Sequence, residues 1–492
     1  MLISNPSLQA FILSGFAMLF LTAPAVEGAT YVAASTKGSD VQAKINIARD
    51  GDTVVVPAGT ARWTTQLSIT KNLTLKGAGI GQTVIFDEVP RSPQVHTMDV
   101  VLTKNLPFRV TGFEFRGDSN VTAANGNGVF YFRGMEGVTS RFRLDHCKFT
   151  GLHGLPLLFR DLIGVIDHCT VETVDTQGAQ VYHNSWGGGD FGHGSWADYP
   201  YWGSDKFLFF EDCAFSSETD RAAIDCYEGA RVVARYSTFN EAQISSHGTE
   251  DQGRGAKQLE IYNNVFTLSS PRGGAQVRSG TVLVHDNVYH NFTRGIDLKA
   301  YRQIVRKGTW GISSGSNVWD LNNSVMAALE RGTHTGADSA TLLIDSNKHW
   351  TTDQWETVVS RKGFSYVLKN ITQNRQSVIE SNTGSRLFYF LYAPPMRFNH
   401  GDTYEIWKVV TTLDQPGQGK SDFLEGLPAL PKKWPHNVIE PCYSWNNKDE
   451  NGNQTDLHTV EGSIQEGQDY YNRTRKPNYA PYLYPHPLTA SN

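Results

Sequence analysis

Seven short segments between residues 142 and 319 repeat one pattern, and this repeat limits the possible fold more than any other feature. Each segment carries a small polar residue, followed two positions later by a large apolar one. The small polar positions are Cys147, Cys169, Cys213, Ser237, Asn264, Asn287 and Asn317; the apolar positions are Phe149, Val171, Phe215, Phe239, Phe266, Tyr289 and Trp319. The steps between them are 22, 44, 24, 27, 23 and 30 residues, and 44 fits one repeat plus an insertion. No repeat contains a long helical stretch, so each is expected to be one coil of strands and turns stacked on its neighbours.

Stacked coils of this kind predict an all-β chain folded as a parallel β-helix, a solenoid. Strands one coil apart then run parallel and in register at about 4.8 Å, and like residues stack on like. The length of 492 residues fits an elongated architecture better than one ordinary compact core. The 46 glycines and the low charged fraction of 19% are typical of β-structure rather than of helical bundles.

Five cysteines in so long a chain are too few, and odd in number, to form a disulfide framework. Their positions in the repeat predict buried thiols that fill an inner corner of the coil.

A second column of residues lies upstream of the first in each repeat and predicts a ligand groove. Each repeat contains a strand that alternates in period two, so one side of it faces outward. The outward positions of this column are Arg133, Arg160, His183, Tyr227, His247, Arg278 and Lys299. Seven coils would place them along about 29 Å. The alternative is that these outward-facing charged side chains only contact solvent and bind no ligand. The column contains no acid although the net charge is −5, and this favours a track for an extended anionic polymer.

A Gly-rich loop interrupts the repeat between His183 and Lys206 and carries several aromatic residues. Aromatic side chains beside a groove are candidate platforms for sugar rings, and the alternative is that the loop packs on itself. The tryptophans of interest are Trp186, Trp196 and Trp202.

The remaining segments predict four regions. Residues 1–28 read as a secretory signal peptide, because an apolar run from Phe11 to Leu21 ends in small residues, although no Lys or Arg precedes it. Residues 29–335 form the parallel β-helix, which begins with a short capping helix near Val41 and Ile45. Residues 336–410 read as a small β-rich insertion, and residues 411–492 as a final coil or cap with a Pro-rich tail.

The motifs GDTVVVPAGT, IDHCTV and IYNNVF resemble those of the right-handed parallel β-helix proteins of the pectate lyase superfamily, over roughly residues 30 to 320. The resemblance implies a right-handed coil. It leaves the activity open, because this superfamily holds polysaccharide lyases, glycoside hydrolases and non-catalytic adhesins or tailspikes. The segment SSHGTEDQGRG is distantly similar to the Gly-His-Gly segment of polygalacturonase-like hydrolases, but their paired-Asp segment is not found.

The chemistry of the column favours elimination. Eliminative cleavage of a uronate needs a base beside the carboxyl group and cations that stabilise the charge that builds on it. His247 or Tyr227 is the candidate base, and the candidate cations are Arg278, Arg254, Lys257 and Lys299.

Hydrolysis needs two carboxyl groups about 5 to 9.5 Å apart. Asp225 and Asp297 are outward but three coils apart, about 14 Å. The loop acids Asp220, Glu228, Glu250 and Asp251 could still serve a hydrolase or bind Ca²⁺, so Ca²⁺ remains a possible cofactor and no metal ligand is assigned.

The sequence therefore predicts a secreted or periplasmic monomer that cleaves an acidic polysaccharide as a lyase. A hydrolase on the same fold and a non-catalytic glycan-binding or adhesive β-helix are the alternatives. With a net charge of −5 and no second apolar run, neither nucleic acid nor a membrane is an expected partner.

Overall fold

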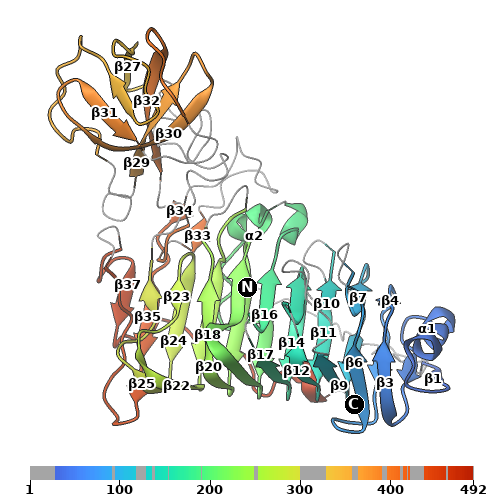
Figure 1. The fold of residues 1–492 in the computed structure, drawn as a ribbon. Helices are drawn as coiled ribbons and strands as arrows, with labels where there is room; N and C mark the ends of the chain where they lie inside the picture. Colours follow the sequence, from blue (N-terminus) through green and yellow to red (C-terminus); the bar gives the residue numbers. More distant parts are fainter. Residues whose placement is uncertain are drawn as a thin grey trace, which may run out of the picture.

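Two long sheets of parallel strands form the main body of the protein, and Figure 1 shows their strands lying side by side along its length. The structure is a computed structural model that describes residues 28–90, 95–117, 129–135, 139–152, 154–174, 176–189, 191–248, 253–299, 328–356, 364–389, 396–410, 414–417, 419–421, 437–460 and 464–490. The predicted signal peptide therefore lies, except for residue 28, outside the described residues. Among the described residues, no helix is both long and apolar enough to span a lipid bilayer.

Within the described residues, the first sheet has twelve strands that pair in one continuous row. In spatial order they are β1 (Thr30–Val32), β2 (Thr53–Val55), β5 (Thr74–Lys76), β8 (Phe108–Thr111), β11 (Thr139–Asp145), β14 (Leu162–Asp167), β17 (Leu208–Glu211), β19 (Arg231–Arg235), β21 (Gln258–Tyr262), β24 (Thr281–His285), β35 (Cys442–Trp445) and β37 (Tyr470–Asn472).

The second sheet, as far as the structure describes the chain, has seventeen strands in two rows, and the long strands β18 and β20 belong to both rows. Row one holds β3 (Gly59–Trp63), β6 (Thr83–Asp87), β9 (Glu114–Gly117), β12 (Lys148–Leu152), β15 (Thr170–Thr173), β18 (Ala214–Tyr227), β20 (Thr238–Ser246), β22 (Val265–Arg272), β25 (Val288–Phe292) and β36 (Lys448–Asp449). Row two holds β4 (Leu67–Ile69), β7 (Met98–Val101), β10 (Phe130–Arg133), β13 (Leu157–Arg160), β16 (Ala179–Tyr182), the second halves of β18 and β20, β23 (Gln276–Val277) and β26 (Asp297–Leu298).

In each coil, successive strands lie in the three rows in a fixed order. Each strand then pairs with the strand of the same row in the previous coil. For example, β13, β14 and β15 follow one another in sequence and lie in row two, the twelve-stranded sheet and row one. All the pairings within these rows are parallel and in register apart from local bulges. The prediction of an all-β chain with parallel strands is confirmed, and the arrangement is consistent with the predicted parallel β-helix.

The interior contains the predicted ladder of small polar residues. The backbone N–H of Cys213 donates to the Ser237 hydroxyl at 3.1 Å, and that of Ser237 donates to Oδ1 of Asn264 at 3.0 Å. The ladder continues to Asn287 and then to Asn447, because β35 pairs with β24 in the position of the next coil. The rung predicted at Asn317 lies outside the described residues. All five cysteines are buried and free, as predicted.

Apolar residues two positions after each rung stack beside the ladder. The rings of Phe215, Phe239, Phe266 and Tyr289 are stacked at centroid distances of 5.3, 4.8 and 5.0 Å. At the other end of the stack, helix α1 (Gly38–Ile47) buries Val41 and Ile45 against the same core, and Figure 1 shows it beside β1 and β3.

The segment between β26 and β35 contains an antiparallel sheet of six strands with its own core. The strands are β27 (Glu330–Thr333), β28 (Leu342–Ile344), β29 (Phe364–Asn370), β30 (Arg375–Asn382), β31 (Arg386–Tyr389) and β32 (Thr403–Val410). A short pair, β33 (Lys420–Ser421) and β34 (Asn437–Val438), follows. Elsewhere in the described part of the chain, helical turns occur at η1 (Trp186–Gly188), α2 (His193–Ala197) and η3 (Pro487–Ala490).

Candidate functional site

The strands of row two place one column of side chains on the outer face of the stack. Arg133 pairs with Arg160, Arg160 with Tyr182, and Tyr182 with Tyr227. One residue earlier in each strand, Cys226 pairs with Ser246, Ser246 with Val277 and Val277 with Leu298. The next residues, His247, Arg278 and Lys299, therefore continue the column. The structure brings six of the seven predicted residues into one line.

The register predicted for His183 is wrong by one residue, because Tyr182 occupies its place in the column. His183 is fully buried. Its Nδ1 accepts the backbone N–H of Arg231 at 3.1 Å, so Nε2 carries the proton and donates to the Leu162 carbonyl at 2.9 Å. Burial lowers the pKa of His183 to about 4, and this side chain is a neutral part of the interior.

The centre of the column is a contact between Asp225, Tyr227 and His247. Asp225 and Tyr227 lie on one side of β18, two residues apart, and His247 follows β20, the neighbouring strand. The Tyr227 hydroxyl lies 2.8 Å from Nε2 of His247. Oδ2 of Asp225 lies 3.0 Å from both of these atoms. Three groups that can move a proton thus meet on one face of two adjacent strands.

Asp225 is held by further donors. Ser245 donates to Oδ1 at 2.8 Å, and the Gln177 amide donates to Oδ2 at 2.6 Å. Gln180 bridges Gln177 to the Tyr182 hydroxyl. The carboxylate is buried, and its hydrogen bonds fix its orientation towards Tyr227 and His247. The sequence showed that Asp225 is outward, but it did not single out Tyr182, Gln177 or Ser245.

The ring side chains of the column stack on one another. The centroids of Tyr182 and Tyr227 are 4.8 Å apart, and those of Tyr227 and His247 are 4.0 Å apart. The faces of Tyr227 are therefore covered, and only ring edges and polar atoms remain for a ligand. Burial, followed by the negative charge of Asp225, raises the pKa of Tyr227 far above its usual value, so the phenol stays protonated.

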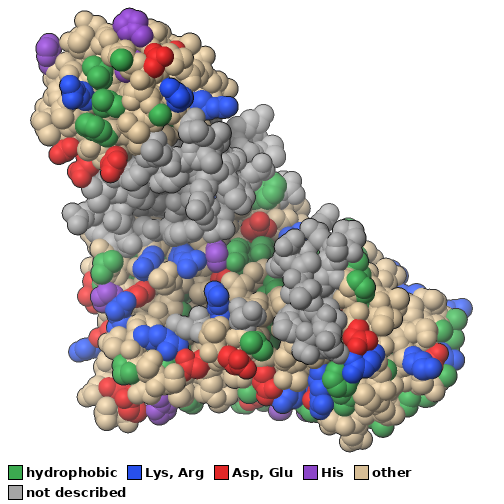
Figure 2. All heavy atoms as spheres, in the orientation of Figure 1, with side chains coloured by type: hydrophobic (Ala, Val, Ile, Leu, Met, Phe, Trp, Pro, Cys, Tyr) green, Lys and Arg blue, Asp and Glu red, His purple; other side chains and the backbone are tan. Residues whose placement is uncertain are grey.

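The cations of the column differ in their partners. Arg133 donates to both carboxylate oxygens of Asp99 at 2.7 Å. Arg278 contacts Gln276 through Nε at 3.2 Å, and Lys299 closes the column one coil later. The neighbouring outward column carries Asp99, Asp225 and Asp297, so the groove is less positive than the sequence predicted. Figure 2 shows Lys, Arg and His side chains on this face with acidic side chains among them.

Arg254 and Lys257 do not lie in the column, which corrects their predicted role. Both are buried. Arg254 donates to the Asp414 carboxylate through Nε at 2.7 Å and through Nη2 at 2.5 Å. Lys257 donates to the backbone carbonyls of Ser195 at 2.6 Å and of Asp198. Burial lowers the pKa of Lys257 well below its usual value. Both cations fix loops rather than offer charge to a ligand.

Two of the three predicted tryptophan platforms pack within the structure. Trp196 is fully buried, and its indole N–H donates to the Gly255 carbonyl at 2.7 Å. Trp186 is 7% exposed and donates to Asp198. Trp202 is half-buried and donates to Glu440 at 2.7 Å. Trp186 and Trp196 therefore fit the alternative that the Gly-rich loop packs on itself, and they are not open platforms for sugar rings. The exposed aromatic residues of this loop are Phe191 and Tyr199.

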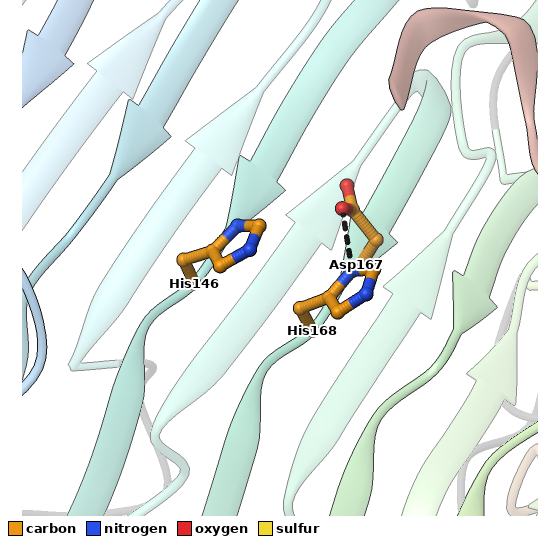
Figure 3. Close-up of side chains that lie close together, drawn as sticks. All are labelled: His146, Asp167 and His168. Carbon is orange, nitrogen blue, oxygen red and sulfur yellow. Dashed lines mark hydrogen bonds and ion pairs between the residues drawn. The ribbon is translucent and has the colours of Figure 1, made fainter. Parts of the chain in front are cut away.

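One group of potential metal ligands lies elsewhere among the described residues, namely His146, Asp167 and His168 (Figure 3). Its geometry does not favour one shared ion. The two imidazoles are stacked, 4.8 Å apart and within 4° of parallel, so their in-plane lone pairs do not converge. Each Nδ1 also contacts an aspartate, Asp145 or Asp167. His146 and His168 both have positive φ and occupy the same turn position in successive coils.

Of the four loop acids considered for hydrolysis or for Ca²⁺ binding, the structure describes the side chain of Glu228 alone. Glu228 accepts the Asn184 amide at 2.5 Å. The side chain of Asp220, and Glu250 and Asp251 entirely, lie outside what the structure describes. In comparisons with known proteins, no family model matches this chain, and no curated protein matches it.

Proposed function

We propose that this protein is a secreted polysaccharide lyase of the right-handed parallel β-helix type seen in the pectate lyase superfamily, and that it cleaves a uronate-containing glycan by β-elimination. The observation that carries this proposal is the contact of the Tyr227 hydroxyl with Nε2 of His247 at 2.8 Å, beside Asp225. The outer face of row two is the substrate groove. The repeat and the three-row topology support the family assignment.

His247 is the proposed base. It removes the proton from the carbon next to the uronate carboxyl group, and the electron pair forms the new double bond as the bond to the glycosidic oxygen breaks. Asp225 contacts Nε2 and stabilises the imidazolium that forms, in the way that an aspartate supports a catalytic histidine.

Tyr227 is the proposed acid. Its raised pKa keeps the phenol protonated, so it can give its proton to the leaving glycosidic oxygen. The resulting phenolate lies 2.8 Å from the imidazolium of His247, which returns a proton to it. The net change is one proton moved from carbon to the leaving oxygen, and each side chain ends with as many protons as it had at the start.

Arg278 is the proposed partner of the substrate carboxylate at the point of cleavage, because it follows His247 in the column by one coil, about 4.8 Å. A guanidinium there offsets the negative charge that builds on the carboxylate during proton removal.

Hydrolysis has less support. Asp225 and Asp297 belong to the same outward column but are separated by three strand pairings, about 14 Å, which exceeds the spacing of hydrolase carboxyl pairs. Asp297 is also bound to Arg294 and His458, at 2.8 and 2.9 Å.

The test is incubation of the purified protein with pectate, alginate and glycosaminoglycans, with and without added Ca²⁺. Ultraviolet absorbance of unsaturated ends is expected for one of them. Reducing ends without that absorbance would indicate a hydrolase, and binding without cleavage an adhesive protein; either overturns the proposal.

Two variants locate the chemistry. His247→Ala and Tyr227→Phe are each expected to lower kcat by about 100-fold or more while the fold is kept. His290→Ala, on β25 of row one, is the matched control and should retain activity. Wild-type turnover in His247→Ala would remove this residue from the mechanism.

A further inference from the structure

We propose that Arg160 forms a separate subsite that binds the acid group of a second sugar, beyond the sugar that is cleaved, so that the protein selects for glycans with more than one acidic residue. This inference rests on the proposed function for the identity of its ligand, and it adds a specificity-determining residue to the same groove.

Arg160 forms no ion pair with an acid among the described residues, unlike the arginine one coil before it, and its charge only acts at a distance on the buried carboxyl of Asp161. The guanidinium of Arg133 is bound to both oxygens of Asp99. Arg160 makes no hydrogen bond or ion pair with a described side chain, and its Nε, like that of Arg133, is buried without a hydrogen-bond partner. A ligand cannot reach this Nε, so it would bind the terminal Nη atoms, which have no acceptor among the described side chains.

Tyr182 holds the guanidinium in place before any ligand binds. The Arg160 guanidinium carbon lies 5.4 Å from the centroid of the Tyr182 ring, a cation–π contact. The Tyr182 hydroxyl donates to Gln180 at 3.0 Å, and the Tyr182 ring is also stacked on the ring of Tyr227. An arginine fixed in this way loses less entropy on binding, and its planar fork of donors matches a carboxylate or a sulfate.

The subsite is distinct from the point of cleavage. Arg160 is two strand pairings from Tyr227, about 10 Å, on the side opposite Arg278. The stacked rings of Tyr182, Tyr227 and His247 stand between the two guanidinium groups. One acid group cannot contact both arginines, so each needs an acid group of its own.

The test is a binding titration in the His247→Ala background, where cleavage does not consume the ligand. The probes are oligosaccharides from the panel above and the same oligosaccharides after reduction of their carboxyl groups. Arg160→Gln is expected to weaken binding of the acidic form by about tenfold or more and to leave the reduced form unchanged.

Two control variants make the result specific. Arg62→Gln removes one charge from row one, where Arg62 is exposed and paired with Glu88, and should bind within about twofold of the parent. Arg160→Lys keeps the charge without the planar fork and should fall between the parent and Arg160→Gln. Circular dichroism and thermal unfolding verify that each variant folds.

The outcomes separate this inference from the proposed function. Equal binding by Arg160→Gln and its parent, or equal loss for acidic and reduced oligosaccharides, overturns the subsite even if the wild type is a lyase. Arg160-dependent binding by a wild type that yields no unsaturated ends retains the subsite and overturns the lyase. A wild type that binds no member of the panel overturns both.

Discussion

The Tyr227 hydroxyl and Nε2 of His247 are 2.8 Å apart, although the two residues are separated by twenty positions in the sequence. They meet because β18 and β20 are adjacent and in register, which places position 247 beside position 227. Asp225 lies on the same side of β18 and contacts both. The outer face of two neighbouring strands thus holds the three side chains on which the proposed function depends.

The first prediction concerns Asp225. In Asp225→Asn the carboxylate that faces Nε2 of His247 is replaced by a neutral amide, so the imidazolium is no longer stabilised. We expect kcat to fall by about 100-fold or more and the acid limb of the pH–rate profile to move, with a smaller effect on KM. Steady-state kinetics across pH measure both quantities.

Ser245→Ala is the matched control for Asp225, since it removes a hydrogen bond to the other carboxylate oxygen and leaves the charge. Its effect on kcat should be much smaller. An Asp225→Asn protein with an unchanged pH profile would mean that this carboxylate is only structural.

The second prediction concerns Asp414, which neutralises buried Arg254. Both side chains are fully shielded from solvent, and Asp414 also accepts the backbone N–H of Gly255 at 3.0 Å. Asp414→Ala leaves a buried guanidinium without its counter-charge and should lower the free energy of unfolding by about 3–5 kcal/mol. Guanidinium chloride unfolding measures this loss.

The double variant Arg254→Met with Asp414→Leu tests the cause, because it removes both charges together. It should be considerably more stable than Asp414→Ala. If the two are equally destabilised, packing rather than the uncompensated charge is responsible.

The third prediction concerns Glu260, whose pKa burial raises to about 7. Its carboxyl accepts the Gly203 N–H at 2.9 Å and the Tyr479 hydroxyl at 2.5 Å, beneath the C-terminal tail. Between pH 4.5 and about 7 the folded protein keeps a proton that the unfolded chain has lost. The contribution of this group to stability is therefore lost as the pH rises through that window, by up to about 3 kcal/mol.

Glu260→Gln does not titrate, so the stability of wild type relative to this variant should fall from pH 5 to pH 8. Urea unfolding of both proteins at the two pH values gives the difference, and Glu88→Gln at the surface is the control. A difference that stays constant with pH would rule out Glu260 as the titrating group.

The fourth prediction concerns the internal ladder at Asn264. Its Oδ1 accepts the Ser237 N–H and its amide donates to the Ala234 carbonyl, at 3.0 and 2.9 Å. Asn264→Ala leaves both backbone groups buried without these partners and should cost about 1–3 kcal/mol for each. Asn264→Ser is expected to cost less, since a serine holds this position one coil earlier. Equal losses in the two variants would contradict the ladder as the cause.

The ladder and the outer column show how far sequence reasoning reaches in this chain. Cys213, Ser237 and Asn264 could be aligned because successive coils place small residues at this inside corner, where they hydrogen-bond to one another. The rung at Asn447 could not be aligned, because the insertion separates it from Asn287 by 160 residues. His183 was misplaced because a slip of one residue exchanges the faces of a strand, and a Gly-rich loop directly follows that strand.

The sequence by itself determined the repeat, and with it parallel strands, an inner ladder and an outward column that contains Tyr227, His247 and the arginines. These features depend on the two-residue period of a strand and on the match between successive coils, which are both local properties of the chain. The tertiary structure alone decided which cations remain available to a ligand. Asp99 pairs with Arg133, and Asp414 pairs with Arg254 from 160 residues away, whereas Arg160 forms no ion pair among the described residues. Charge pairing depends on distances in space, and no period in the sequence records them.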